Sequence, residues 1–287
     1  MDRPLLIAQL TDIHIGFDRG NPDEHNMLRL REAIDRLVNG PNRPDLLLLT
    51  GDLTEFGDAE SYARLAEAVA PCPFPVWPMT GNHDDREALV AAFPQTPLND
   101  GFVQFVLDLD GLRLIVLDTL EPGRHGAGFC ETRAKWLVDR LAEDRTTPTV
   151  IAMHHPPFES GIAWLDSDAR EPWIARFADA VRGNGQICGI IAGHLHRTIH
   201  TQFEGFQLTV CSSIAPTVAF DLTPIDPETP DNRPMITDEP AIYALHRWDG
   251  KQFVSHFEGL GLYPVWARFD DSLKPIVRII HDERPPA

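Results

Sequence analysis

The sequence predicts an α/β fold, and two patterns in its 287 residues carry this prediction. Apolar, strand-like runs alternate with amphipathic, helix-like segments from residue 5 to about residue 200, which is typical of α/β proteins. Beyond that point, two hairpin-like stretches flank a segment rich in Pro and Asp, residues 221–240. The chain is long enough for one large domain or two smaller ones. We expect residues 1–200 to form the core, and residues 201–287 to add strands and an arm without forming an independent domain.

Each expected element follows from a local pattern, taken in chain order. Apolar runs predict strands at residues 5–10, 45–50, 74–80, 149–154 and in the run that leads into His194. Helical periodicity predicts helices over residues 24–39, 58–70, 131–143 and 172–182. Turn residues predict three hairpins, centred on Asp110-Gly111, Glu204-Gly205 and Asp249-Gly250. We expect residues 221–240 to form a long irregular arm and residues 270–287 a loosely held tail.

Composition and charge exclude several classes of protein. The formal net charge of −18 argues against binding to nucleic acid or to an anionic membrane, because both are polyanions. The four cysteines lie far apart and form no C-x-x-C pair, so we expect reduced thiols rather than disulfides or a thiolate zinc site. No signal peptide or membrane span is recognisable. We therefore expect a cytoplasmic protein.

Five of the predicted strands are followed by side chains that can bind metals. These side chains are Asp12 and His14; Asp52; Asn82, His83 and Asp84; His154 and His155; His194 and His196. Each motif alone has an ordinary explanation as a turn, a helix cap or a loop. In α/β sheets, however, ligands bind where the carboxyl ends of the strands meet. Independent accidents at five strand ends are a much less economical explanation than one shared site.

The residue types indicate a pair of metal ions. Imidazole and carboxylate ligands together suit Mn, Fe, Zn or Co. The seven candidate ligands are Asp12, His14, Asp52, Asn82, His154, His194 and His196. Seven ligands are too many for one catalytic ion, which must keep a position open, but they suit two ions that share one carboxylate. On an extended chain His194 and His196 would share a face, and His155 would point away from its neighbour His154.

Together these motifs resemble the calcineurin-like metallophosphoesterases, in the branch of class III cyclic nucleotide phosphodiesterases and glycerophosphodiesterases. The matching motifs run in the family's order: Asp12-x-His14, Gly51-Asp52, Gly81-Asn82-His83-Asp84, His154-x-Pro156 and Gly193-His194-x-His196. The resemblance implies a sandwich of two mixed β-sheets flanked by helices. It also implies that one ion is held by Asp12, His14 and His196, the other by Asn82, His154 and His194, and that Asp52 bridges them.

The resemblance also implies that His83 faces the substrate phosphate as the catalytic residue, with Asn82 and His196 as further substrate contacts. We expect Asp84 or a neighbouring carboxylate to orient the imidazole of His83. Glu55 and Arg19 are candidates for the pocket mouth, and His155 for packing or a hydrogen bond to the site. We expect His125 and His200 in loops or on the surface, with lining of the substrate pocket as the alternative. Ala219 stands where some glycerophosphodiesterase-like members carry a histidine, which weakens the case for a glycerol-specific pocket.

The predicted activity is metal-dependent hydrolysis of a phosphodiester, with 3′,5′-cyclic AMP as the first candidate substrate. The alternatives are a glycerophosphodiesterase, a phosphatase acting on monoesters, pyrophosphates or triesters, and a non-catalytic binding protein. The last is disfavoured because all seven ligands and His83 are present. We also expect a homodimer or higher oligomer, and we expect residues 221–240 and the last hairpins to form a cap or a dimer contact. Trp248, Phe253 and Trp266 could support such an interface, although core packing explains them equally well.

Overall fold

Two mixed β-sheets form the centre of the molecule, which a computed structural model describes over residues 3–285. The first sheet has the order β13-β12-β1-β2-β3, and the second has the order β4-β5-β6-β7-β9-β8. The strands of the first sheet are β1 (Leu5–Leu10), β2 (Leu46–Thr50), β3 (Val76–Met79), β12 (Ile242–Trp248) and β13 (Phe253–Gly259). Those of the second are β4 (Phe105–Leu109), β5 (Leu112–Val116), β6 (Thr149–Ala152), β7 (Ile187–Ala192), β8 (Ile199–Phe203) and β9 (Phe206–Val210).

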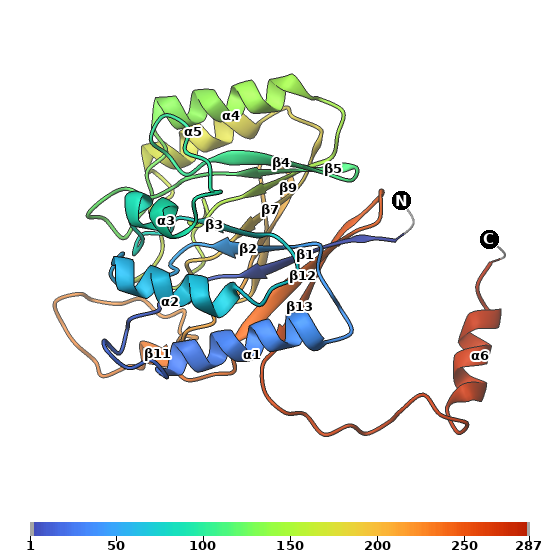
Figure 1. The fold of residues 1–287 in the computed structure, drawn as a ribbon. Coiled ribbons are helices and arrows are strands. Elements are labelled where there is room, and N and C mark those ends of the chain that lie inside the picture. The colour runs from blue at the N-terminus through green and yellow to red at the C-terminus, as the bar shows by residue number, and fades with distance from the viewer. Residues whose placement is uncertain (1–2, 286–287) are drawn as a thin grey trace.

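Helices cover the outer faces of both sheets (Figure 1). The helices α1 (His25–Asn39) and α2 (Ala59–Val69) lie on the first sheet, and α4 (Glu131–Glu143) and α5 (Pro172–Val181) on the second. This arrangement confirms the predicted sandwich of two mixed sheets flanked by helices. Among residues 3–285, no helix combines the length and the apolar character that crossing a membrane requires.

The apolar side chains of the second sheet point alternately to two cores. Leu114 on β5 and Val150 on β6 belong to the core between the sheets, whereas Ile115 and Ile151 belong to the core beneath α4 and α5. Because the side chains of a strand alternate between faces, a strand that is buried on both sides needs a continuous apolar run. The runs that predicted β5 and β6 have this character, which explains why these strands were recognisable.

The parallel strands β1, β2 and β3, and likewise β5, β6 and β7, bring their carboxyl ends to common edges. The C-terminal strands join the same sheets: β12 pairs antiparallel with β1, and β9 pairs parallel with β7. The hairpins at Asp110-Gly111, Glu204-Gly205 and Asp249-Gly250 connect paired strands as predicted. The four cysteines form no disulfide with one another, also as predicted.

Two helices were not predicted. The helix α3 (Arg86–Ala92) is short, and it begins at Asp85, whose side chain accepts a hydrogen bond from the backbone N–H of Ala88 at 2.9 Å. The helix α6 (Lys274–Asp282) lies in the expected tail and stands apart from the rest of the chain (Figure 1). The arm expected at residues 221–240 is irregular, apart from a two-residue pairing of β10 (Thr217–Val218) with β11 (Ile236–Thr237).

Candidate metal centre

The loops after β1, β2, β3, β6 and β7 meet at the edge formed by the carboxyl ends of these strands, and they hold one another through their backbones. The N–H of Asp12 donates to the carbonyl of Gly51 at 3.0 Å, and the N–H of His14 donates to that of Asp52 at 3.0 Å. The N–H of Gly193 donates to the carbonyl of His154 at 3.0 Å. The positions of the predicted ligands are therefore fixed by backbone pairing as well as by their own side chains.

The first group of side chains consists of Asp12, His14 and His196, whose potential ligand atoms lie within 4.8 Å of one another. The Nε2 atoms of His14 and His196 are 3.3 Å apart, and the Nε2 atom of His196 lies 3.4 Å from Oδ1 of Asp12. The structure thus brings together the three residues that the family resemblance assigns to one ion.

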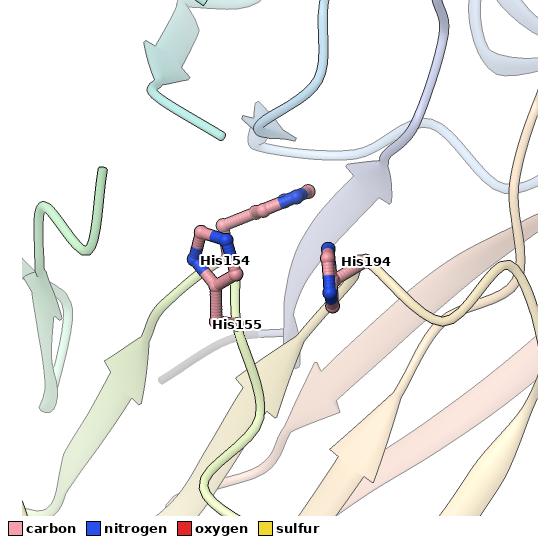
Figure 2. A group of neighbouring side chains, drawn as sticks. All are labelled: His154, His155 and His194. Atoms are coloured by element: carbon pink, nitrogen blue, oxygen red, sulfur yellow. The ribbon is translucent and has the colours of Figure 1, made fainter. Parts of the chain in front are cut away.

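The second group contains His154 and His194, and Asp52 lies between the two groups. Oδ2 of Asp52 is 3.2 Å from Nε2 of His154 and 3.8 Å from Nε2 of His14. The rings of His154 and His194 have their centroids 5.3 Å apart. Figure 2 shows His154 and His155 on one loop and His194 on a neighbouring loop. The position of Asp52 is the one required of a shared carboxylate.

The hydrogen bonds of the imidazoles leave one nitrogen of each ring available to a cation. Nδ1 of His154 donates to the carbonyl of Thr50 at 2.7 Å, and Nδ1 of His196 to that of Pro216 at 2.8 Å. Nδ1 of His14 lies 2.8 Å from Oε2 of Glu55. A hydrogen bond from one ring nitrogen fixes the tautomer in which the other can bind a metal.

Two buried atoms of the site have no hydrogen-bond partner among the described residues, namely Nε2 of His154 and Oδ1 of Asn82. Leaving a buried polar atom unpaired is costly. Both atoms have the lone pair that a metal ligand offers, so the residues present fit a cation. This fit is independent of the resemblance of the motifs.

The electrostatics of the site also favour a cation. Burial opposes ionisation, but His196 holds the pKa of Asp12 below its usual value, and His154 holds that of Asp52 well below it. Burial likewise opposes the charging of His154, yet Asp52 raises its pKa to about 9. Burial and the neighbouring His154 lower the pKa of His194 to about 3. Two ionised carboxylates and a neutral His194 are the protonation states that metal binding requires, whereas a cation beside Asp52 would have to displace the proton of His154.

The backbone at these residues corrects one expectation. The residues Asp12, His14, Asp52, His194 and His196 all have positive φ angles, between 49° and 73°. The prediction that His194 and His196 share a face of an extended chain is therefore wrong. Their rings reach the site because each residue adopts the left-handed conformation, which is unfavourable outside glycine and clusters at functional sites.

Two glycines of the motifs are required by close packing rather than by conformation. A methyl group at Gly81 would collide with the carboxylate of Asp52, and one at Gly193 would collide with the hydroxyl of Thr11. Larger residues at these positions would displace the neighbouring ligands. Close packing therefore explains why a glycine precedes Asn82 and His194 in these motifs.

The residue that orients His83 is Glu55 rather than Asp84. Nδ1 of His83 donates to the backbone carbonyl of Glu55 at 2.9 Å. The backbone N–H of His83 donates to Oδ1 of Asp52 at 2.8 Å. Asp84 instead accepts hydrogen bonds from the N–H groups of Leu53 and Gly81 and from the buried hydroxyl of Tyr62. Burial and the nearby Asp52 raise the pKa of Asp84 to about 6. The proposed pairing of Asp84 with His83 is wrong, and Asp84 joins the loops after β2 and β3.

Four further polar residues considered for the site differ in their distance from the pocket. Both ring nitrogens of His155 are used, by the hydroxyl of Thr119 at 2.8 Å and the carbonyl of His125 at 3.1 Å, which leaves no lone pair for an ion. His125 is exposed, as expected, and it also lines the pocket, 3.4 Å from the amide nitrogen of Asn82. His200 is exposed on β8, as expected. The guanidinium of Arg19 lies over the ring of Phe56, outside this pocket.

The polar cluster opens into a pocket of about 320 Å³, close to the lower end of the range for small-molecule sites. Its floor contains His14, Asp52, Asn82, His83, His194 and His196. Its walls are apolar and comprise Phe17, Trp164, Leu165, Val218 and Ile236. These wall residues were not predictable from motifs, because Phe17, Trp164 and Leu165 lie in irregular segments and Val218 and Ile236 in the two-residue strands β10 and β11.

The fold and the clustered histidines and carboxylates define the class of protein: an α/β sandwich with a candidate two-metal centre at its strand ends. The chain belongs to the calcineurin-like phosphoesterase family, whose sequence model matches residues 5–198. The family and the clusters together indicate a dinuclear metal site.

Individual relatives and structures agree with this assignment. The chain is 38% identical over 192 residues to a probable cyclic nucleotide phosphodiesterase of Rhodococcus erythropolis, and the match covers 64% of this chain and 62% of the relative. It thus spans less than two thirds of that relative's length. A probable glycerophosphodiester phosphodiesterase of Arcobacter nitrofigilis is 26% identical over 89% of this chain and 95% of its own. The crystal structure of a dimetal phosphatase from Danio rerio has a TM-score of 0.59 at 15% identity, covering 88% of this chain and 99% of that one, and shows a shared fold.

Proposed function

We propose that the protein hydrolyses phosphodiesters at a pair of metal ions, with 3′,5′-cyclic nucleotides as preferred substrates. The observation that carries this proposal is the pocket, in which a floor of potential metal ligands adjoins an apolar wall containing Trp164 and Phe17. A cyclic nucleotide has the matching two parts, a charged phosphate and a flat base that stacks on aromatic rings. The relative from Rhodococcus, a probable cyclic nucleotide phosphodiesterase, supports the same substrate class.

The residues that would hold the ions follow from the two groups. Asp12, His14 and His196 would hold one ion, Asn82, His154 and His194 would hold the other, and Asp52 would serve both. Manganese, iron, zinc and cobalt all suit this set of imidazole and oxygen ligands. When bound, a pair of such ions supplies a hydroxide nucleophile near neutral pH and neutralises charge on the phosphate.

His83 is the residue that we propose to act on the leaving group. Its Nδ1–H is held by the carbonyl of Glu55, so a protonated ring presents Nε2–H to the pocket and can donate that proton to the leaving oxygen. Asn82 and His196 line the same pocket and would contact the phosphate oxygens. Positioned donors of this kind stabilise charge that develops in the transition state.

A glycerophosphodiester is the second candidate substrate. The relative from Arcobacter aligns over nearly the whole of this chain, including the C-terminal strands, whereas the match to the Rhodococcus relative covers only 64% of it. A glycerol group, however, offers no flat apolar surface for the wall of the pocket. Phosphomonoesters and phosphotriesters are further alternatives, because the same centre could accept them.

The proposed localisation and the proposed partners rest on composition. The net charge of −18 and the free cysteines support a cytoplasmic protein without nucleic-acid or membrane partners.

The substrate is tested by comparing kcat/KM for 3′,5′-cyclic AMP with that for glycerophosphoethanolamine, using manganese-loaded protein. We expect a clear preference for the cyclic nucleotide. A preference for the glycerol diester would move the second candidate to first place. Inactivity on both substrates with metal bound would contradict the proposal and favour a monoester or triester.

A further inference from the structure

The C-terminal segment, residues 261–285, leaves the body of the molecule and carries α6 away from both sheets (Figure 1). Every residue from 262 to 285 is exposed except Leu273, which is half-buried. The helix α6 lies beyond the end of the first sheet at which β1 begins, whereas the metal centre lies at the carboxyl end of β1. The segment is therefore remote from the proposed active site.

The direction in which this segment leaves is fixed by contacts with α1. The guanidinium of Arg36 donates to the carbonyls of Gly259, at 3.2 Å, and of Gly261. The N–H of Gly261 donates in return to Oε1 of Glu32 at 3.0 Å. The first residues of the segment are thus held in place, and the rest extends from an anchored point.

The extended part carries an unusual amount of exposed apolar surface. Leu262 is 100% exposed, Trp266 95% and Phe269 74%. Leu273, which precedes α6, and Ile276, Val277 and Ile280 within it follow the i, i+3, i+4, i+7 spacing of one helix face. Soluble monomers seldom leave such a continuous apolar surface in water.

The exposed area is large enough for a stable interface. The aromatic side chains of the segment expose most of the ~150–250 Å² that such groups present, and several exposed aliphatic side chains add to them. The total is roughly 800 Å², about what each partner contributes to a standard protein interface. Two copies of the chain would each contribute an area of this size, which is what a stable dimer needs.

The chain also carries a surface that could receive this segment. A groove of about 590 Å³ lies beside the anchored root, with Tyr243, Leu245 and Leu6 among its lining residues and Arg36 and Glu258 also beside it. Its own α6 lies away from this groove (Figure 1). Because the groove lies next to the anchored start of the C-terminal segment, two copies related by a two-fold axis could each place their segment in the groove of the other.

We propose that two copies of this chain exchange their C-terminal segments, so that the apolar face of α6 of one copy packs in the groove of the other. This assignment differs from the expected interface at residues 221–240. It also separates the three aromatic residues considered for an interface: Trp248 is 3% exposed and Phe253 packs against the core, so only Trp266 remains.

The first test measures the mass in solution of the full chain and of two variants by light scattering, over a range of protein concentrations. The wild type should show twice the 32.1 kDa of one chain. The double variant Ile276→Glu/Ile280→Glu places charges on the apolar face and should have the mass of a monomer, with its thermal stability and hydrolytic activity retained. The matched control Arg278→Glu places the same residue on the opposite face and should remain a dimer.

A second test locates the contact. In the double variant Val277→Cys/His256→Cys, one cysteine lies on the apolar face of α6 and the other in the groove. Mild oxidation should give a covalent dimer on a non-reducing gel. An oxidised monomer with an internal disulfide would place α6 in its own groove, and the absence of any cross-link would exclude the groove. Either result, or a monomeric wild type, overturns the proposal.

Discussion

Glu55 contacts two residues of the candidate metal centre through two different groups. Its carboxylate lies 2.8 Å from Nδ1 of His14, and its backbone carbonyl accepts from Nδ1 of His83 at 2.9 Å. Burial opposes ionisation, yet the hydrogen bond with His14 keeps the pKa of Glu55 below its usual value. A carboxylate that orients a metal-binding imidazole also makes it a better ligand.

We therefore expect Glu55→Ala to weaken the affinity for the first metal ion by about 10- to 100-fold. Calorimetric titration of the metal-free protein with Mn²⁺ measures this loss directly. Glu55→Gln keeps an acceptor oxygen and should lose less. Glu67→Ala removes an exposed carboxylate from the adjacent helix α2 and should bind metal like the wild type. Equal affinities in all four proteins would show that Glu55 has no such role.

The His83→Ala variant should separate catalysis from metal binding. Loss of a general acid reduces the rate by about 10²- to 10⁴-fold, so kcat should fall to this extent. The metal content, measured by elemental analysis, should stay at the wild-type level because no metal-ligand role is proposed for His83. A parallel fall in metal and activity would mean that His83 holds an ion.

At the scale of the elements, the strand ends were predictable but the shape of the loops after them was not. Buried strands have apolar runs, and the polar residues after them mark the edge where they end. The left-handed conformation of His194 and His196 leaves no signature in the sequence, because its cost is offset by contacts between loops that are distant in the chain. The helix α3 was missed because its seven residues are too few to establish a helical period.

The Gly193→Ala variant tests the packing of these loops. The added methyl group would collide with Thr11 and approach Asp12, and overpacking of this kind costs about 1–3 kcal/mol. We expect a lower Tm and weaker metal binding. Gly185→Ala is the matched control, since its methyl group would meet no atom within 4 Å. If both variants have the same Tm and metal affinity, the close contact of Gly193 with Thr11 and Asp12 does not require glycine at this position.

The wall of the pocket could not be predicted from motifs, because Trp164 and Phe17 lie on irregular segments and reach the site only through the fold. Stacking of a base on an aromatic ring is worth about 1–3 kcal/mol. The Trp164→Ala variant should therefore lose about 5- to 150-fold in kcat/KM for 3′,5′-cyclic AMP. Its kcat/KM for glycerophosphoethanolamine should hardly change, and an equal loss on both substrates would argue against contact with the base.

At the scale of the whole molecule, the family's core and the C-terminal strands form shared sheets, since β12 pairs with β1 and β9 with β7. We infer that the core and the C-terminal strands up to residue 259 fold as one unit. The alternation of strands and helices predicted an α/β fold, the family resemblance implied the sandwich, and the strand-end motifs predicted the seven candidate ligands. The detached position of α6 was not predictable, because an amphipathic pattern does not reveal which surface will cover it.

The central claim is that the seven clustered side chains bind two metal ions on which hydrolysis depends. The most direct measurement is a titration of metal-free protein with Mn²⁺, followed by calorimetry and by phosphodiesterase activity in the same samples. Two equivalents should bind per chain, activity should appear as they bind, and Asp52→Ala should lose at least one equivalent together with activity. Full activity without metal, or two equivalents retained by Asp52→Ala, would contradict the account.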